Sequence, residues 1–224
     1  MPDFVHAAVA GYLSGLAPAE DEVLAAVRAR SAADGVPALS ADTAWLLHVV
    51  ASAVRPARIF EIGTGYGYSG LHLARALAPG GALFTVERDA ARAAVAREHF
   101  MRAGVADRVN VMVGEAVRLV HKVAGPFDVI VQDGSKDQYE PTFDRLIGLL
   151  RPGGVLFTDN ILWRGDVIPG FRAEAAHPAE STEAVRRFSR RLAADPRLVT
   201  TFLPVGDGVA VSVKRDDAGS TPSS

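Results

Sequence analysis

The chain has 224 residues, no cysteine and a formal net charge of −2, with 49% apolar and 22% charged residues. This length and composition suit one globular domain with a substantial core, and the absence of cysteine excludes disulfides and thiolate metal sites. The charge lacks the basic excess of nucleic-acid-binding domains, and no apolar run reaches the roughly 18 residues of a membrane helix. Because the N-terminus also has no cationic leader segment, we expect a cytoplasmic protein with no nucleic-acid or membrane partner.

Amphipathic helices are predicted at the start of the chain, around residues 4–13 and 21–33. A third helix begins at Ser40, a favourable N-cap residue, and continues with apolar residues at helical spacing. From residue 58 onward, strands and helices alternate. The predicted strands cover residues 58–62, 82–86, 109–113, 127–132 and 155–158, and the helices between them cover 69–77, 89–103, 116–123 and 139–150. Such alternation is typical of an α/β protein with a mostly parallel sheet and helices on both faces.

The end of the chain has a different pattern. The segment "STEAVRRFSRRLAADP" (181–196) is a predicted helix that Pro196 terminates. It is followed by "LVTTFLP", the turn "VGDG" and "VAVSVK", which together predict an antiparallel hairpin. A hairpin of this kind is not the usual ending of a nicotinamide-binding Rossmann domain. We expect a single domain over residues 1–215 and a disordered polar tail over residues 216–224.

A glycine-rich turn follows the first predicted strand, in the stretch "FEIGTGYGYSG" (60–70). Gly65, Gly67 and Gly70 match G-x-G-x-x-G, the fingerprint of dinucleotide-binding proteins. The strand, however, ends at Gly63, so the apparent motif begins too late for that fingerprint. We interpret Gly63, Gly65 and Gly67 as making room for a ligand, whereas Gly70 falls inside the next helix, where its small size serves packing.

Polar residues recur where the predicted parallel strands end, which is the edge at which open α/β sheets bind ligands. Glu87 ends the second strand and could accept hydrogen bonds from the hydroxyls of an adenosine ribose. Its alternative role is a negative charge at the start of the following helix. Glu61 lies inside an apolar strand, so it needs partners: turn amides, which would make its role structural, or the ammonium group of a ligand.

Asp133 ends the fourth strand, and Asp159 and Asn160 end the fifth. Two carboxylates and an amide oxygen suit a hard cation such as Mg²⁺, although Asp and Asn also commonly begin loops. Lys136 follows Asp133 closely and could act as a base if burial lowers its pKa; otherwise it is a solvated loop lysine. The six histidines show no metal-ligand spacing and are interpreted as structural: His6, His48, His72, His99, His121 and His177.

These residues, with the motifs "FEIGTGYGYS", "TVERD", "VQDGSKDQYEPTF", "TDNILWRGDV" and "LAADPRLVTTFLPVGDGVAVSVK", resemble the cation-dependent class I S-adenosylmethionine O-methyltransferases. This family includes catechol and caffeoyl-CoA O-methyltransferases. The resemblance extends from about Ser40 to Lys214, and the D-x-x-K-D-x-Y run beginning at Asp133 is its most specific part. It implies a Rossmann-like class I methyltransferase fold, with a seven-stranded, mostly parallel sheet and a C-terminal antiparallel hairpin.

The resemblance also implies a role for each matching residue. Turn residues would hold the methionine part of S-adenosylmethionine, with Glu87 at the ribose and Ala116 near the adenine. The turn residues in question are Glu61, Gly63, Gly65, Gly67 and Ser69, of which Glu61 has the least direct role. Asp133, Asp159 and Asn160 would bind Mg²⁺ or another divalent cation such as Ca²⁺ or Mn²⁺, with Asp133 also bordering the cofactor and the reacting atoms. Lys136 would be the catalytic base that deprotonates a phenolic hydroxyl.

One departure from the family pattern concerns the substrate pocket. Gly134 and Ser135 stand where catechol O-methyltransferase has larger, ring-bearing residues, so we expect Trp163 to fill part of that space. The Pro-, Gly- and Ala-rich stretch 164–181 is a predicted loop at the pocket. Residues 1–39 are expected to help select the substrate or to form a homodimer, and the substrate is a small phenolic molecule or its CoA thioester.

Two other classes of protein share parts of this pattern. A nicotinamide-dependent oxidoreductase would explain the glycine turn and Glu87, but not Asp133, Lys136, the Asp-Asn pair or the terminal hairpin. A non-catalytic protein with an S-adenosylmethionine-binding fold would be expected to lack the metal and base positions, which this chain retains. Transfer to nitrogen or to RNA is disfavoured by the neutral charge balance.

Overall fold

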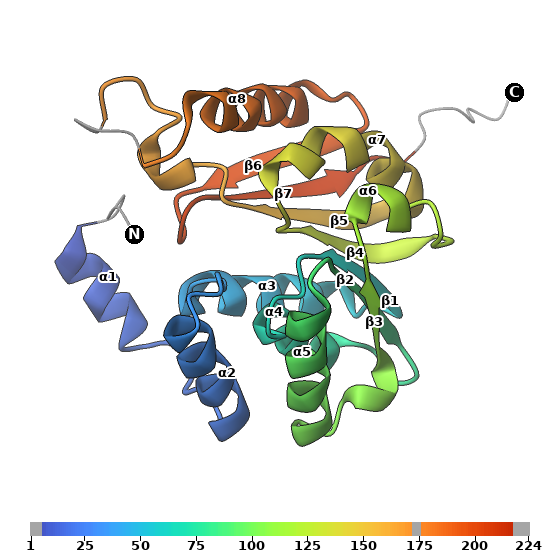
Figure 1. The fold of residues 1–224 in the computed structure, drawn as a ribbon. Coiled ribbons are helices and arrows are strands. Elements are labelled where there is room, and N and C mark those ends of the chain that lie inside the picture. Colours follow the sequence, from blue (N-terminus) through green and yellow to red (C-terminus); the bar gives the residue numbers. More distant parts are fainter. Residues whose placement is uncertain (1–5, 172–175, 217–224) are drawn as a thin grey trace, which may run out of the picture.

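The computed structural model describes residues 6–171 and 176–216 of the chain (Figure 1). The helices are α1 (Ala7–Ser14), α2 (Glu22–Ala33), α3 (Ala41–Val54), α4 (Tyr68–Ala76), α5 (Ala90–Arg102), α6 (Ala116–Leu119), α7 (Tyr139–Leu149) and α8 (Ala179–Ala194). The strands are β1 (Arg58–Ile62), β2 (Ala82–Glu87), β3 (Val109–Val113), β4 (Phe127–Gln132), β5 (Leu150–Asp159), β6 (Leu198–Leu203) and β7 (Val209–Lys214). Short 3-10 helices are η1 (Ala106–Arg108), η2 (Lys136–Gln138) and η3 (Trp163–Gly165). No helix of the described part is long and apolar enough to cross a membrane.

The sheet has seven strands in the order β3-β2-β1-β4-β5-β7-β6. Strands β1 to β5 are parallel, and β7 lies antiparallel between β5 and β6. The predicted fold class, including the C-terminal antiparallel hairpin, is therefore confirmed. The strand order reverses between β1 and β4, which is the point where α/β sheets of this kind bind ligands.

Helices cover both faces of the sheet, as Figure 1 shows, with α2 to α5 on one side and α6 to α8 on the other. Side chains alternate between two cores, as the strand period requires. In β4, for example, Val129 and Val131 pack with α3 and α4, whereas Ile130 packs with α7. Glu61 follows Phe60 in β1 and therefore faces the α4 side, even though a free glutamate side chain is charged at neutral pH.

Some predicted bounds were wrong, for reasons that lie in tertiary contacts. The helix predicted over 116–123 ends at Leu119. Beyond it, the carbonyls of Val120 and Val123 accept hydrogen bonds from the Arg145 guanidinium (3.2 and 3.0 Å) in place of further helical hydrogen bonds. The fifth strand begins at Leu150 rather than 155, since Leu150 pairs with Phe127 across a bulge. The predicted start of the first helix and nearly all of the predicted tail lie outside the described residues.

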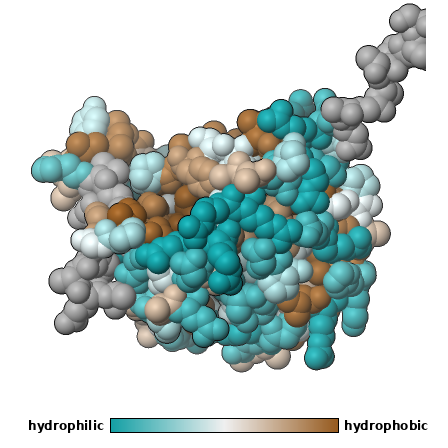
Figure 2. Space-filling view, turned by 90° about the horizontal axis from the view of Figure 1, so that it is seen from above, coloured by the Kyte–Doolittle hydropathy of each residue, from teal (hydrophilic) through white to brown (hydrophobic). Residues whose placement is uncertain are grey.

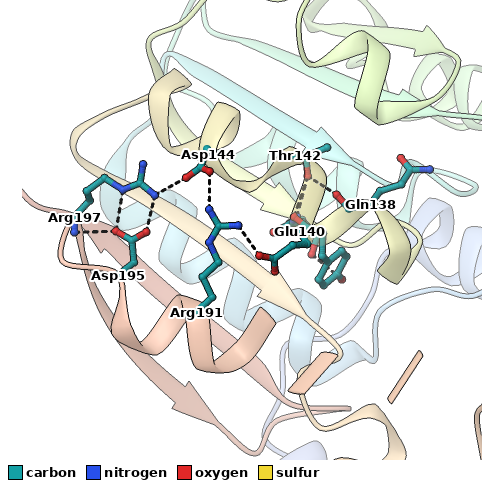
Figure 3. Close-up of polar contacts among 9 residues, drawn as sticks. Gln138, Glu140, Thr142, Asp144, Arg191, Asp195 and Arg197 are labelled. Atoms are coloured by element: carbon teal, nitrogen blue, oxygen red, sulfur yellow. Dashed lines mark hydrogen bonds and ion pairs between the residues drawn. The ribbon is translucent and has the colours of Figure 1, made fainter. Parts of the chain in front are cut away.

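Helix α8 is fixed to α7 by an apolar contact and by a network of ion pairs (Figure 3). The Phe188 ring lies 5.2 Å from that of Tyr139, centroid to centroid. On the surface, the Arg191 guanidinium binds both Glu140 and Asp144, at 2.5 and 2.6 Å. Exposed ion pairs each add little stability, so the aromatic contact dominates. Docking of α8 matters for function because Tyr139, at the start of α7, reaches the site described next.

Candidate active site

A cavity of about 640 Å³ lies at the carboxyl ends of β1, β2, β4 and β5. This volume is typical of sites for small molecules and cofactors. Nearly all of the predicted site residues line the cavity: Gly63, Gly65, Ser69, Glu87, Ala116, Asp133, Lys136, Asp159, Asn160 and Trp163. Glu61 and Gly67 do not. Strand order places Glu87, at the end of β2, and Asp159, at the end of β5, on opposite sides of this cavity.

The glycine turn brings β1 close to the end of β4. Gly63 has a φ of +102°, and a Cβ added there would lie 2.8 Å from the carbonyl carbon of Asp133, so only glycine fits. Gly67 and Gly70 instead lie against the Phe100 ring, where an added Cβ would approach to 3.0 and 2.8 Å. The predicted packing role of Gly70 is confirmed, and Gly67 shares it.

Glu87 holds the glycine turn against the end of β2. Its carboxylate accepts hydrogen bonds from the backbone N–H groups of Gly65 (2.8 Å) and Asp89 (3.0 Å). The N-cap of α5 is Asp89, which accepts from Ala91 and Arg92, so Glu87 is not needed as the charge at that helix end. Because each carboxylate oxygen has a second lone pair, Glu87 can still accept hydrogen bonds from a ligand.

Glu61 is completely buried beneath the turn. The Thr85 hydroxyl donates to its Oε2 (2.6 Å), and Oε1 has no partner within the described part of the chain. Burial raises the pKa of Glu61 to about 7, despite the opposing effects of the Ser69 and Thr85 hydroxyls. Its neighbours are therefore side-chain hydroxyls rather than turn amides, and its place in the structure is behind the cavity wall.

The predicted cation ligands form an oxygen-rich group. Burial raises the pKa of Asp133 to about 6, and it raises that of Asp159 well above its ordinary value. Asp159 Oδ1 is buried with no hydrogen-bond partner among residues 6–171 and 176–216, and Asn160 Oδ1 accepts a hydrogen bond from Lys136 Nζ at 2.6 Å. Among the described residues no three His, Cys, Asp or Glu side chains group closely enough to hold a metal. The predicted set of two carboxylates and an amide is of a different kind, and its orphaned carboxylate oxygen fits a hard cation.

Lys136 lies at the centre of this group. Its Nζ donates to Gly134 O (3.2 Å), Tyr139 Oη (2.6 Å) and Asn160 Oδ1 (2.6 Å), and lies 3.7 Å from Asp133 Oδ1. Burial lowers the pKa of Lys136, while the charge of Asp133 opposes that shift. The arrangement satisfies all three protons of an ammonium group. With only 9% of its side chain exposed, Lys136 is therefore a largely buried residue of the site and not a solvated loop lysine.

Comparison with known proteins identifies the family. A family model described as O-methyltransferase matches residues 17–215. The catechol O-methyltransferase of Niastella koreensis is 34% identical over 224 residues, covering 95% of this chain and 99% of that protein. The chain belongs to the O-methyltransferase family.

Solved structures of O-methyltransferases have the same fold. TomG from Streptomyces achromogenes, an O-methyltransferase involved in tomaymycin synthesis and solved in complex with SAM, is 33% identical with a TM-score of 0.83. That comparison covers 93% of this chain and 96% of TomG. An O-methyltransferase from Bacillus cereus, solved in complex with SAH, is 32% identical with a TM-score of 0.81, covering 93% of this chain and 97% of that one.

The structure of this O-methyltransferase also brings residues to the site that sequence reasoning missed. Asp207, in the hairpin turn, accepts hydrogen bonds from the Arg164 N–H (2.6 Å) and the Asn160 side-chain amide (3.4 Å). A signal for Asp207 existed: a turn that precedes an antiparallel strand lies at the carboxyl edge of its parallel neighbour. The pairing of Val209 with Asp159 places it there.

Two further side chains reach the cavity of the methyltransferase from its two sides. Gln138 accepts from the Ala116 N–H (3.2 Å) and donates to the Glu115 carboxylate (2.6 Å), which ties η2 to the start of α6. His177 lines the cavity and stacks on Trp163. Its interpretation as a purely structural histidine was therefore incomplete. No local spacing pairs it with Trp163, because the contact is made by a long loop.

Proposed function

We propose that this O-methyltransferase moves the methyl group of S-adenosylmethionine to a hydroxyl of a vicinal dihydroxy (catechol-like) aromatic, with the help of a divalent cation such as Mg²⁺. The observation that carries the proposal is the meeting of Asp133, Lys136 and Asn160 in the cavity that Glu87 and the glycine turn also line. Oxygen ligands suit a hard cation, and a buried lysine suits proton transfer from a hydroxyl. The name catechol O-methyltransferase, borne by a relative, agrees with this reading.

The β1–β2 side of the cavity is the proposed cofactor site. S-adenosylmethionine supplies a methyl group on a sulfonium centre, which a nucleophile can take directly, without a covalent enzyme intermediate. Gly63 and Ser69, which line this side of the cavity, would border the methionine part, and Glu87 would accept hydrogen bonds from the ribose hydroxyls. Ala116 borders the adenine, and its small side chain leaves room for a flat ring. Glu61 contributes from behind the cavity wall: it accepts a hydrogen bond from the Thr85 hydroxyl, which in turn contacts the hydroxyl of Thr64 in the glycine turn.

The β4–β5 side is the proposed cation and substrate site. Asp133, Asp159 and Asn160 would hold the cation, which, when bound, supplies a positive charge that lowers the pKa of a neighbouring substrate hydroxyl. Lys136 accepts the hydroxyl proton at Nζ, and burial favours the neutral amine that this role requires. Trp163 contributes the apolar wall for the aromatic ring. Rate enhancement then rests on alignment of the hydroxyl oxygen with the methyl carbon.

A homodimer belongs to the same proposal, with residues 1–39 at the interface. Helix α1 has no buried residue, and it exposes Tyr12 (68%) and Leu13 (54%). Figure 2 shows hydrophobic side chains gathered at the end of the molecule where α1 lies, while the middle of that face is hydrophilic. An apolar helix left uncovered on a monomer supports burial against a second copy. Sedimentation of wild type against Tyr12→Glu tests this, because a monomer in both cases would refute it.

The experiment that tests the reaction is a methylation assay with labelled S-adenosylmethionine and a small panel of catechols, with and without EDTA. We expect methylated product that disappears on chelation and returns with added Mg²⁺. Turnover that survives EDTA would refute the role of the cation. Calorimetry with S-adenosylhomocysteine and with NAD separates the proposal from a nicotinamide-dependent oxidoreductase. Binding of S-adenosylhomocysteine without any catechol turnover would support a non-catalytic binding protein or a different substrate.

A further inference from the structure

An aromatic pair forms the wall of the cavity beyond the proposed cation ligands. The indole ring of Trp163 stacks on the imidazole ring of His177, with centroids 3.8 Å apart and planes 22° from parallel. Both side chains line the cavity. Lys136 Nζ lies 5.6 Å from the centroid of the indole ring, so this wall adjoins the reacting end of the site.

Trp163 needs support from other residues to keep this position. Its backbone has a φ of +50°, which is rare for a large residue, so the local chain alone does not favour the conformation. Its Nε1 is buried with no hydrogen-bond partner in the part of the chain that the structure describes. The stacked imidazole is therefore a contact that holds the indole ring in its orientation.

His177 is itself held by a buried carboxylate. The side chain of Asp166 is only 1% exposed, and it accepts hydrogen bonds from the N–H groups of Ala176 and His177 and from His177 Nδ1, each at 2.9 Å. A carboxylate is an acceptor, so the ring proton must lie on Nδ1, and the plane of the ring is fixed. Arg186, on α8, donates to the carbonyls of Asp166 (2.9 Å) and Val167 (3.0 Å) and so anchors these two residues to that helix.

We propose that Asp166 and His177 are positioning residues for substrate selection. They hold the Trp163 indole ring in a fixed orientation at the edge of the cavity, where a flat aromatic substrate packs against it. This inference rests on the proposed function, since it concerns the aromatic substrate of the same site. The physical basis is the preference of aromatic rings for stacked or edge contacts. If the indole ring were mobile, the entropy cost of ordering it on binding would offset the free energy of that contact. A loop contact with only a structural role would alter stability but would leave selection of the substrate unchanged.

The position of Trp163 can be measured without turnover, because the chain has only two tryptophans. The second, Trp45, lies on α3 against His48 and His72, so a Trp45→Phe background reports on Trp163 alone. In this background we expect His177→Ala to change the emission intensity and wavelength of Trp163 and to lower its anisotropy. His177→Phe keeps a stacking ring and should keep the anisotropy. Unchanged emission and anisotropy in His177→Ala would overturn the inference.

Kinetics test the consequence for the substrate, with 3,4-dihydroxybenzoate as the probe. Loss of one aromatic contact predicts that His177→Ala raises the KM for the catechol roughly threefold to tenfold. The KM for S-adenosylmethionine should stay unchanged, because its site lies on the β1–β2 side. His177→Phe should restore the catechol KM, and Asp166→Asn should raise it by frustrating the two His177 donors. Equal effects of His177→Ala and His177→Phe on the catechol KM would refute selection through the stacked ring.

Failure of the proposed function gives a different result. In that case the wild-type enzyme would methylate no catechol, and 3,4-dihydroxybenzoate would not quench Trp163 in the presence of S-adenosylhomocysteine and Mg²⁺. If the wild type binds and methylates the probe while His177→Ala behaves identically, only the positioning role fails. Circular dichroism and thermal unfolding of each variant exclude general misfolding as the cause of a change.

Discussion

Replacing Gly63 with alanine tests whether the close approach of β1 and β4 builds the cavity. Gly63 has a φ of +102°, and an added Cβ would lie 2.8 Å from the carbonyl carbon of Asp133 and closer still to its oxygen. The left-handed backbone costs an L residue about 1–2 kcal/mol. Overpacking against backbone adds about 1–3 kcal/mol. The expected loss of unfolding free energy is therefore about 2–5 kcal/mol, which corresponds to a fall in Tm of roughly 4–20 °C for a domain of this size.

Gly80→Ala is the matched control. Gly80 also has a positive φ (+75°), but no atom of the described residues lies within 4 Å of an added Cβ, so only the backbone cost of about 1–2 kcal/mol applies. Urea denaturation of both variants gives the two free energies, and calorimetry with S-adenosylhomocysteine gives the affinity. We expect Gly63→Ala to lose more stability and to bind the ligand more weakly, since Asp133 must move. Equal stability losses in the two variants would refute the argument from close approach.

Three further outcomes are expected. Lys136→Ala should lower kcat by about 10²–10⁴-fold and leave calorimetric binding of S-adenosylhomocysteine intact, whereas exposed Lys122→Ala should change neither; an unchanged kcat would remove Lys136 as the base. Asp207→Ala frees the Asn160 amide and should weaken Mn²⁺ binding about 10-fold or more, measured by calorimetry beside exposed Asp107→Ala; equal Mn²⁺ affinities would refute the positioning role. Burial lowers the pKa of His72 to about 4 from an ordinary value of 6.5. The stability that the buried neutral imidazole contributes to the fold is therefore fully present above pH 6.5 and is lost as pH falls toward 4. Urea denaturation should show wild type losing up to about 3 kcal/mol more than His72→Phe over that window, and parallel pH profiles would contradict this.

The order of the elements and the location of the site could be predicted from local sequence patterns and from the residues at the strand ends. The short apolar runs of β1, β2 and β4 and the helical spacing in α3 are local properties, so the order of elements could be predicted from residues alone. Parallel strands share one carboxyl edge, so Asp133, Asp159 and Asn160 could be expected near one another before any contact was known. The glycine turn could be placed at the same edge for the same reason.

Contacts between distant segments decided the rest. The end of α6 depends on Arg145, which comes from α7, and the burial of Glu61 depends on how α4 covers β1. Asp207 and His177 enter the cavity from a hairpin turn and a long loop, whose paths no local pattern specifies.

By itself, then, the sequence determined the element order, the sheet class and the edge of the sheet at which the site lies, because each follows from short-range periodicity and chain direction. Only the tertiary structure decided that the Lys136 ammonium lies between Asn160 and Tyr139, and that Trp163 stacks on His177. Those positions result from packing, burial and hydrogen bonding between segments that meet only in the folded chain.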